Sequence, residues 1–150
     1  MVELISTGVI TASSVLLFGY WFRYTCLLIL SAKTTRDYAA AVAHANQLGF
    51  LQVQSQLRES VPDLDILKAS LDRDYEMLTY LLKHASNAAE GAESIEKRML
   101  EINYRLMRGW FSVARKFSPA AAARALEEMS QVVAHFANAM GERSAVSAAA

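Results

Sequence analysis

Cysteine, proline and an excess of charge of either sign are what this sequence lacks. Its 150 residues include one cysteine, Cys26, which excludes an internal disulfide framework and a zinc site built from several cysteines. Fifteen Lys and Arg side chains balance fifteen Asp and Glu side chains, so no net charge attracts the chain to nucleic acid. Two prolines and six glycines in a chain rich in Ala, Leu, Glu and Arg favour helices over strands. We therefore expect an all-α fold and no nucleic-acid partner.

Residues that could carry chemistry are few and scattered. His44, His84 and His135 lie on three different predicted helices, and none is four residues from another. The Glu-x-x-His pair that di-iron bundles use is missing. Cys26 and His44 would lie about 27 Å apart along a helix, too far for a nucleophile and its base. We predict that the protein is not an enzyme and has no metal site and no cofactor; the sequence indicates no cofactor-binding residue.

Charged side chains are absent from one long stretch near the start, Leu4 to Phe22 (LISTGVITASSVLLFGYWF). About 20 apolar residues in a helix cross the hydrocarbon layer of a membrane, and a helix satisfies its own backbone groups there. A signal peptide would instead need a basic start and a small-residue cleavage site after a shorter apolar core. Residues 1–33 are therefore predicted to form a single transmembrane anchor with its membrane-interface segment.

The charges on the two sides of this span differ. Glu3 precedes it, whereas Arg23, Lys33 and Arg36 follow it, so the positive-inside rule places the C-terminal domain in the cytoplasm. The sequence leaves open whether the anchor helix continues into residues 34–59. Cys26, beside the membrane, could accept a palmitoyl group, although an unmodified thiol is the simpler interpretation.

Small residues share one face of the predicted span. Gly8, Ala12, Val15 and Gly19 recur at steps of four, three and four, and small side chains let two helices approach closely in lipid. We predict that this face binds a partner helix. The alternative is that glycine and alanine are common in membrane helices whatever their contacts.

Amphipathic helices are predicted for the rest of the chain. Their ranges are 34–59, 64–89, 92–117 and from Ser118-Pro119 to Gly141, with breaks at Val61-Pro62 and 87–91. Residues 34–141 form the predicted bundle domain, and 142–150 form a disordered tail because they show no apolar period. Short turns predict an antiparallel, coiled-coil-like bundle of three to four helices.

The helix over 92–117 has two neighbouring apolar stripes. The first contains Ile95, Met99, Ile102, Leu106, Trp110, Val113 and Phe117; the second contains Leu100, Tyr104, Met107, Phe111 and Ala114. Folding the chain about residues 90–91 and about Ser118 brings the first stripe opposite apolar side chains of both neighbouring helices. We therefore expect Trp110 at the centre of the core, between Leu71 and Leu126.

Charges face each other across the first of these hairpins. An acidic run on 63–76 is opposite a basic run that contains Arg105, Arg108 and Arg115. Complementarity within the domain explains this pattern, and a basic face that docks on anionic lipid or on an acidic partner is the alternative. Asp74 interrupts the apolar seam of its helix, so we expect it to turn to the flank and pair with Arg108 or Arg105.

The sequence therefore favours a membrane-anchored helical interaction module, or a small subunit of a membrane complex, that binds a protein partner or a second copy through helix surfaces. A lipid- or cofactor-binding bundle is the alternative, and it would need a cavity around Trp110, Phe111 and Phe136. An enzyme whose site carries no recognisable motif is the third hypothesis.

Overall fold

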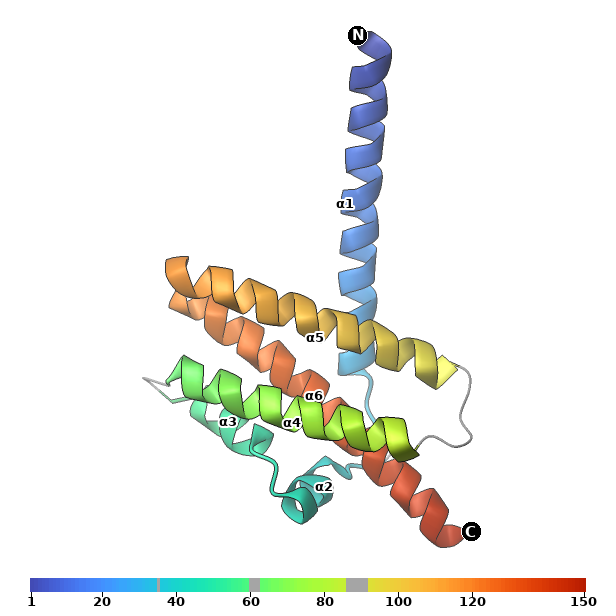
Figure 1. Cartoon of the computed structure of the whole chain (residues 1–150), viewed down its shortest axis with the longest axis vertical. Coiled ribbons are helices and arrows are strands. Elements are labelled where there is room, and N and C mark those ends of the chain that lie inside the picture. Colours follow the sequence, from blue (N-terminus) through green and yellow to red (C-terminus); the bar gives the residue numbers. More distant parts are fainter. Residues whose placement is uncertain (35, 60–62, 86–91) are drawn as a thin grey trace. The chain divides into compact units, whose positions relative to one another are not determined.

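The computed structural model describes residues 1–34, 36–59, 63–85 and 92–150 (Figure 1). Within these ranges the protein is all-α, with six helices and no strand. The helices are α1 (Val2–Ser31), α2 (Ala39–Asn46), α3 (Phe50–Gln56), α4 (Leu64–Ala85), α5 (Ala92–Phe117) and α6 (Pro119–Ala149). The chain forms two compact units, Met1–Lys33 and Thr34–Ala150. The predicted breaks at 61–62 and 87–91 fall on residues outside the described ranges.

The first unit is a single helix, α1. It is long and apolar enough to cross a membrane by length and composition, and none of its most apolar stretch is buried inside the chain. A signal sequence near an N-terminus meets the same criterion. The helix ends at Ser31, and Ala32 after it has extended backbone angles, so α1 does not continue into residues 34–59.

Residues 34–59 contain two short helices, α2 and α3, where the periodicity predicts one. The break lies at Gln47, whose φ of 54° is left-handed and cannot continue a helix. Two residues later, the backbone N–H of Gly49 donates to the Asp74 carboxylate (2.7 Å), and α3 begins at Phe50. A side chain at position 49 would collide with Ser70 of α4. Glycine thus allows the close approach of the two segments without a shift of the Ser70 hydroxyl.

The second unit is a helical bundle organised around α6. This helix packs against α2, α3, α4 and α5, and Figure 1 shows it running between α4 and α5. Its start agrees with the sequence prediction, because the Ser118 hydroxyl accepts a hydrogen bond from the N–H of Ala121 (3.3 Å) and Pro119 is the first helical residue. Val132, Val133, Phe136 and Ala137 are fully buried along it.

The end of α6 corrects the prediction of a disordered tail at 142–150. The helix passes through Gly141 and ends at Ala149. Gly141 is buried and packed against Tyr38, with no room for a β-carbon, so this glycine permits a close contact and does not end the helix. The Arg143 side chain also donates to the carbonyl oxygen of Leu82 (3.3 Å). The tail lacks an apolar period, but contacts with other elements hold its first turn.

Asp74 also lies where the sequence did not place it. Its side chain is buried and accepts the Gly49 N–H, while Arg108 pairs with Asp72. The predicted pairing of Asp74 with an arginine was wrong because the seam of α4 at this position faces the start of α3, whose first N–H groups lack partners within their own helix. Burial raises the pKa of Asp74, although the N–H groups of Gly49 and Phe50 oppose this effect.

Asp74→Asn should flatten the pH dependence of stability. Because burial raises the pKa of Asp74 in the folded state, the wild type loses stability as the pH rises from about 4 through that raised pKa. Asparagine keeps a side-chain oxygen that can accept the Gly49 N–H, but it carries no negative charge. Asp74→Ala leaves the N–H unpaired and should be less stable than Asp74→Asn by about 1–3 kcal/mol. Urea unfolding of the full chain in detergent, at several pH values, measures both; equal pH slopes for wild type and Asp74→Asn would contradict the assignment.

Candidate interaction surface

Helix α5 buries one of its two apolar stripes and leaves the other outside. Leu100, Tyr104, Phe111 and Ala114 are at most 3% exposed, and this side packs against α6. These four residues belong to the second stripe. The bundle core therefore contains the second stripe, whereas the hairpin register predicts the first stripe there.

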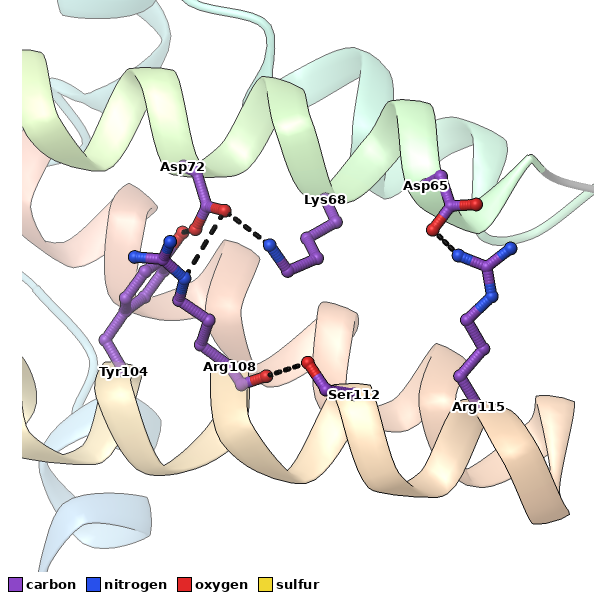
Figure 2. Close-up of polar contacts among 7 residues, drawn as sticks. All are labelled: Asp65, Lys68, Asp72, Tyr104, Arg108, Ser112 and Arg115. Atoms are coloured by element: carbon purple, nitrogen blue, oxygen red, sulfur yellow. Dashed lines mark hydrogen bonds and ion pairs between the residues drawn. The ribbon is translucent and has the colours of Figure 1, made fainter.

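A cluster of polar side chains around Asp72 joins α5 to α4 (Figure 2). The Asp72 carboxylate accepts hydrogen bonds from Lys68 Nζ (2.7 Å) and from the Tyr104 hydroxyl (3.0 Å), and Arg108 Nε lies 3.6 Å away. Lys68 and Asp72 come from α4, whereas Tyr104 and Arg108 come from α5. One carboxylate thus satisfies groups from both helices and fixes which side of α5 faces α4.

The Tyr104 ring reinforces this arrangement. It stacks on Tyr75 of α4 with ring centres 3.8 Å apart and the planes nearly parallel. Burial raises the pKa of Tyr104, and the Asp72 carboxylate raises it further. Burial also raises the pKa of Tyr75. Both phenols therefore stay protonated at neutral pH, and Tyr104 acts as a hydrogen-bond donor with a structural role.

The predicted basic docking face is largely engaged inside the bundle. Arg108 pairs with Asp72 and Arg115 pairs with Asp65 (Figure 2), and Arg105 forms a side-chain hydrogen bond with Tyr75. These pairs are the ones expected if the chain folds back on itself at residues 90–91. Pairing of opposite charges within the domain thus explains why Arg108 and Arg115 lie opposite the acidic side of α4. Both remain about half exposed, so each pair contributes only about 0–1 kcal/mol.

The first stripe is the exposed surface of α5. Six of its members are between 45% and 82% exposed: Ile95, Ile102, Leu106, Trp110, Val113 and Phe117. These six residues and half-buried Met99 are called the α5 apolar face below. Scattered apolar side chains are normal on a protein surface, but a continuous row of large ones indicates an interaction site.

The predicted central position of Trp110 was wrong. Trp110 is 50% exposed, whereas its neighbour Phe111 is 2% exposed and lies in the core. A signal in the sequence could have shown this, because Arg108 and Arg115 lie almost opposite the first stripe on a helical wheel. A helix that turns these arginines toward the acidic side of α4 must turn Trp110 away from it.

The predicted partner-binding face of α1 has no neighbour among the described residues of its own unit, Met1–Lys33. Gly8, Ala12, Val15 and Gly19 are all exposed, and a β-carbon added at Gly8 or Gly19 would have no neighbour within 4 Å. The face is therefore open, and its partner stays a prediction.

The histidines do not converge. His44 is exposed, the His84 ring lies tilted by 37° against the Tyr80 ring (ring centres 4.1 Å apart), and burial lowers the pKa of half-buried His135. In the described part of the chain, no three His, Cys, Asp or Glu side chains are grouped so that they could hold a metal ion.

A hollow of about 500 Å³ lies where α4, α5 and α6 meet. Its lining includes Leu82, Glu96, His135, Phe136 and Arg143. A ligand-binding bundle was expected to have a cavity around Trp110, Phe111 and Phe136. Of these three residues, only Phe136 lines this hollow.

Comparison with known proteins adds no identification: no family model, curated protein sequence or solved structure matches the chain.

Phe111→Ala and Trp110→Ala should separate the two faces of α5. Removing the buried ring should lower the free energy of unfolding by about 3–5 kcal/mol, whereas removing its half-exposed neighbour should cost less than about 1 kcal/mol. Urea unfolding of the full chain in detergent measures both. Equal losses would mean that Trp110, too, lies in the core.

Proposed function

We propose that the protein is a membrane-anchored helical interaction module, or a small subunit of a membrane complex, that works through surface contact and not through catalysis. In this proposal α1 is a single transmembrane span, the bundle is antiparallel and coiled-coil-like, and it lies on the cytoplasmic side. A protein partner binds the span along Gly8, Ala12, Val15 and Gly19, and the bundle makes its own contact through the α5 apolar face.

The observation that carries this proposal is the exposure of the α5 apolar face. A helix that buries one apolar stripe in a bundle has no need of a second stripe unless something else covers it. Two further observations support the membrane location: α1 is long and apolar enough for a span, and its most apolar part is unburied. An exposed apolar helix of this length is unfavourable in water and favourable in a bilayer.

A ligand-binding bundle is the second candidate, and the hollow beside His135 is the observation that favours it. Its volume of about 500 Å³ is within the range of small-molecule sites. The charged side chains of Glu96, Lys97, Glu142 and Arg143 line it together with Leu82, Phe136 and Val146, so its ligand would have both polar and apolar parts. Such a function would leave the α5 apolar face unexplained, and for this reason we rank it second.

The membrane location can be tested by extraction and protease protection. The full-length chain should remain in the membrane pellet at alkaline pH, and protease should reach the bundle only after the cytoplasmic side is opened to it. Leu16→Lys with Leu17→Lys is the matched control, because each lysine in the middle of a span costs roughly 2.5–3.5 kcal/mol on insertion. A shortened chain that is released into the soluble fraction would identify α1 as a signal sequence and contradict the proposal.

The partner face of α1 has its own test. Gly8→Ile and Gly19→Ile should weaken association of the full chain in vesicles, measured by energy transfer between labelled copies or with a co-purified complex, because the bulk keeps two helices apart. Leu16→Ile and Leu17→Ile, on other faces, should have little effect. Association that is the same for all four variants would leave α1 with an anchoring role only.

A further inference from the structure

The spacing along the α5 apolar face limits the shape of the surface that covers it. Its residues repeat every eleven positions: Ile95, Leu106 and Phe117; Met99 and Trp110; Ile102 and Val113. Three turns per eleven residues is about 3.67 residues per turn, close to the 3.6 of a straight α-helix. The face therefore runs nearly parallel to the helix axis from the beginning of α5 to its end.

A left-handed coiled coil fits this face poorly. Its seam follows a 3.5-residue period, which would place positions 109 and 116 on the seam after Ile95, Met99, Ile102 and Leu106. These positions are Gly109 and Lys116. Helices that cross at the common angle of about 50° touch over a short stretch only. A right-handed pair of helices and a flat surface both contact an eleven-residue row along its whole length, so the choice between them depends on the side chains beside the row.

The charges beside the face indicate the chemistry of that surface. Arg98, Arg105 and Lys116 are exposed along one border, and Glu96 is exposed near the other border, beside α6. The local balance is therefore positive. Trp110, half exposed in the middle of the row, is a side chain that favours the boundary between lipid and water. A row of large apolar side chains bordered by basic residues is the pattern of helices that lie in the plane of a membrane surface.

The connection to α1 keeps such a surface within reach. Residues 32–38 separate the end of α1 from the start of α2, and fully extended they span about 30 Å at most. If α1 crosses a bilayer, the bundle is held near its surface at a high effective concentration. A weak affinity of α5 for lipid is then sufficient for docking.

We infer that the α5 apolar face docks on the surface of an anionic lipid membrane, with Trp110 and its apolar neighbours in the interfacial layer and Arg98 and Lys116 against lipid phosphates. This inference rests on the proposed function, because α1 must be inserted in the same membrane. The bundle then has two attachments to the bilayer, one through the span and one along α5.

Tryptophan fluorescence of the full-length chain in vesicles tests the docking. The chain has two tryptophans, Trp21 and Trp110, so Trp21→Phe leaves Trp110 as the reporter. In vesicles of phosphatidylcholine mixed with phosphatidylserine, Trp110 emission should shift to the blue, be quenched by lipids brominated near the headgroup and be shielded from acrylamide. A second reporter, Trp21→Phe with Trp110→Phe and Ser112→Trp, places the ring on the polar flank and should stay accessible to acrylamide.

Charge variants test the chemistry of the contact. Arg98→Gln should weaken docking about fivefold, as expected for one basic side chain near an anionic surface. Arg124→Gln on the exposed side of α6 is the matched control and should have little effect. Docking of the wild type should also weaken in vesicles of phosphatidylcholine alone and when salt is added.

Each other outcome overturns the docking. If acrylamide reaches Trp110 in anionic vesicles as freely as it reaches the Ser112→Trp reporter, the face does not contact lipid. If Trp110 is shielded but brominated lipid does not quench it, the face is covered by protein, and dependence on the protein-to-lipid ratio would identify a second copy. Alkaline extraction of the same vesicles separates the two proposals: release of the chain refutes the membrane anchor, whereas an inserted chain with an accessible Trp110 refutes the docking alone.

Discussion

The rotation of α5 about its own axis depends on one half-buried carboxylate, that of Asp72. Asp72 accepts hydrogen bonds from Lys68 and from the Tyr104 hydroxyl, and it lies beside Arg108. Because the groups from α5 share one side of that helix, the carboxylate turns Phe111 toward α6 and Trp110 toward the outside. A carboxylate so placed would be costly to leave unpaired, since burying a charge is unfavourable without hydrogen bonds. The exposed surface of the bundle thus follows from a polar contact on its other side.

Two further contacts show how close approach and polar satisfaction determine the rest of the bundle. At Gly49 the chain comes near Ser70, and the Asp74 carboxylate accepts the free N–H there. At Gly141 the helix α6 lies directly against Tyr38, so the longest helix of the bundle passes through its glycine uninterrupted. In both places glycine provides space for a neighbouring element, and its conformational freedom is not used.

The proposed function assigns different work to the two units. The span α1 would provide location and a face for a partner helix, while the bundle would provide a rigid platform for a row of apolar side chains. Rigidity is useful in this arrangement, because a helix that is already folded and oriented loses little conformational entropy when it binds. Contact through the α5 apolar face would fix the orientation of the bundle, whereas the span alone would only anchor it.

The sequence by itself determined the elements that depend on local patterns. Apolar periodicity located the long helices, Ser118-Pro119 located the start of α6, and the uncharged run of Leu4 to Phe22 located the most apolar part of α1. The break at Gln47, the partner of Asp74, the extension of α6 beyond Gly141 and the choice between the two stripes of α5 were decided by the tertiary structure. Periodicity shows which residues share a face of a helix, but whether that face points inward depends on hydrogen bonds and contacts with elements distant in the sequence. For α5 the first stripe holds seven apolar side chains and the second holds five, so apolar content alone would favour burial of the first. The second stripe is buried on the side where Tyr104 and Arg108 contact Asp72.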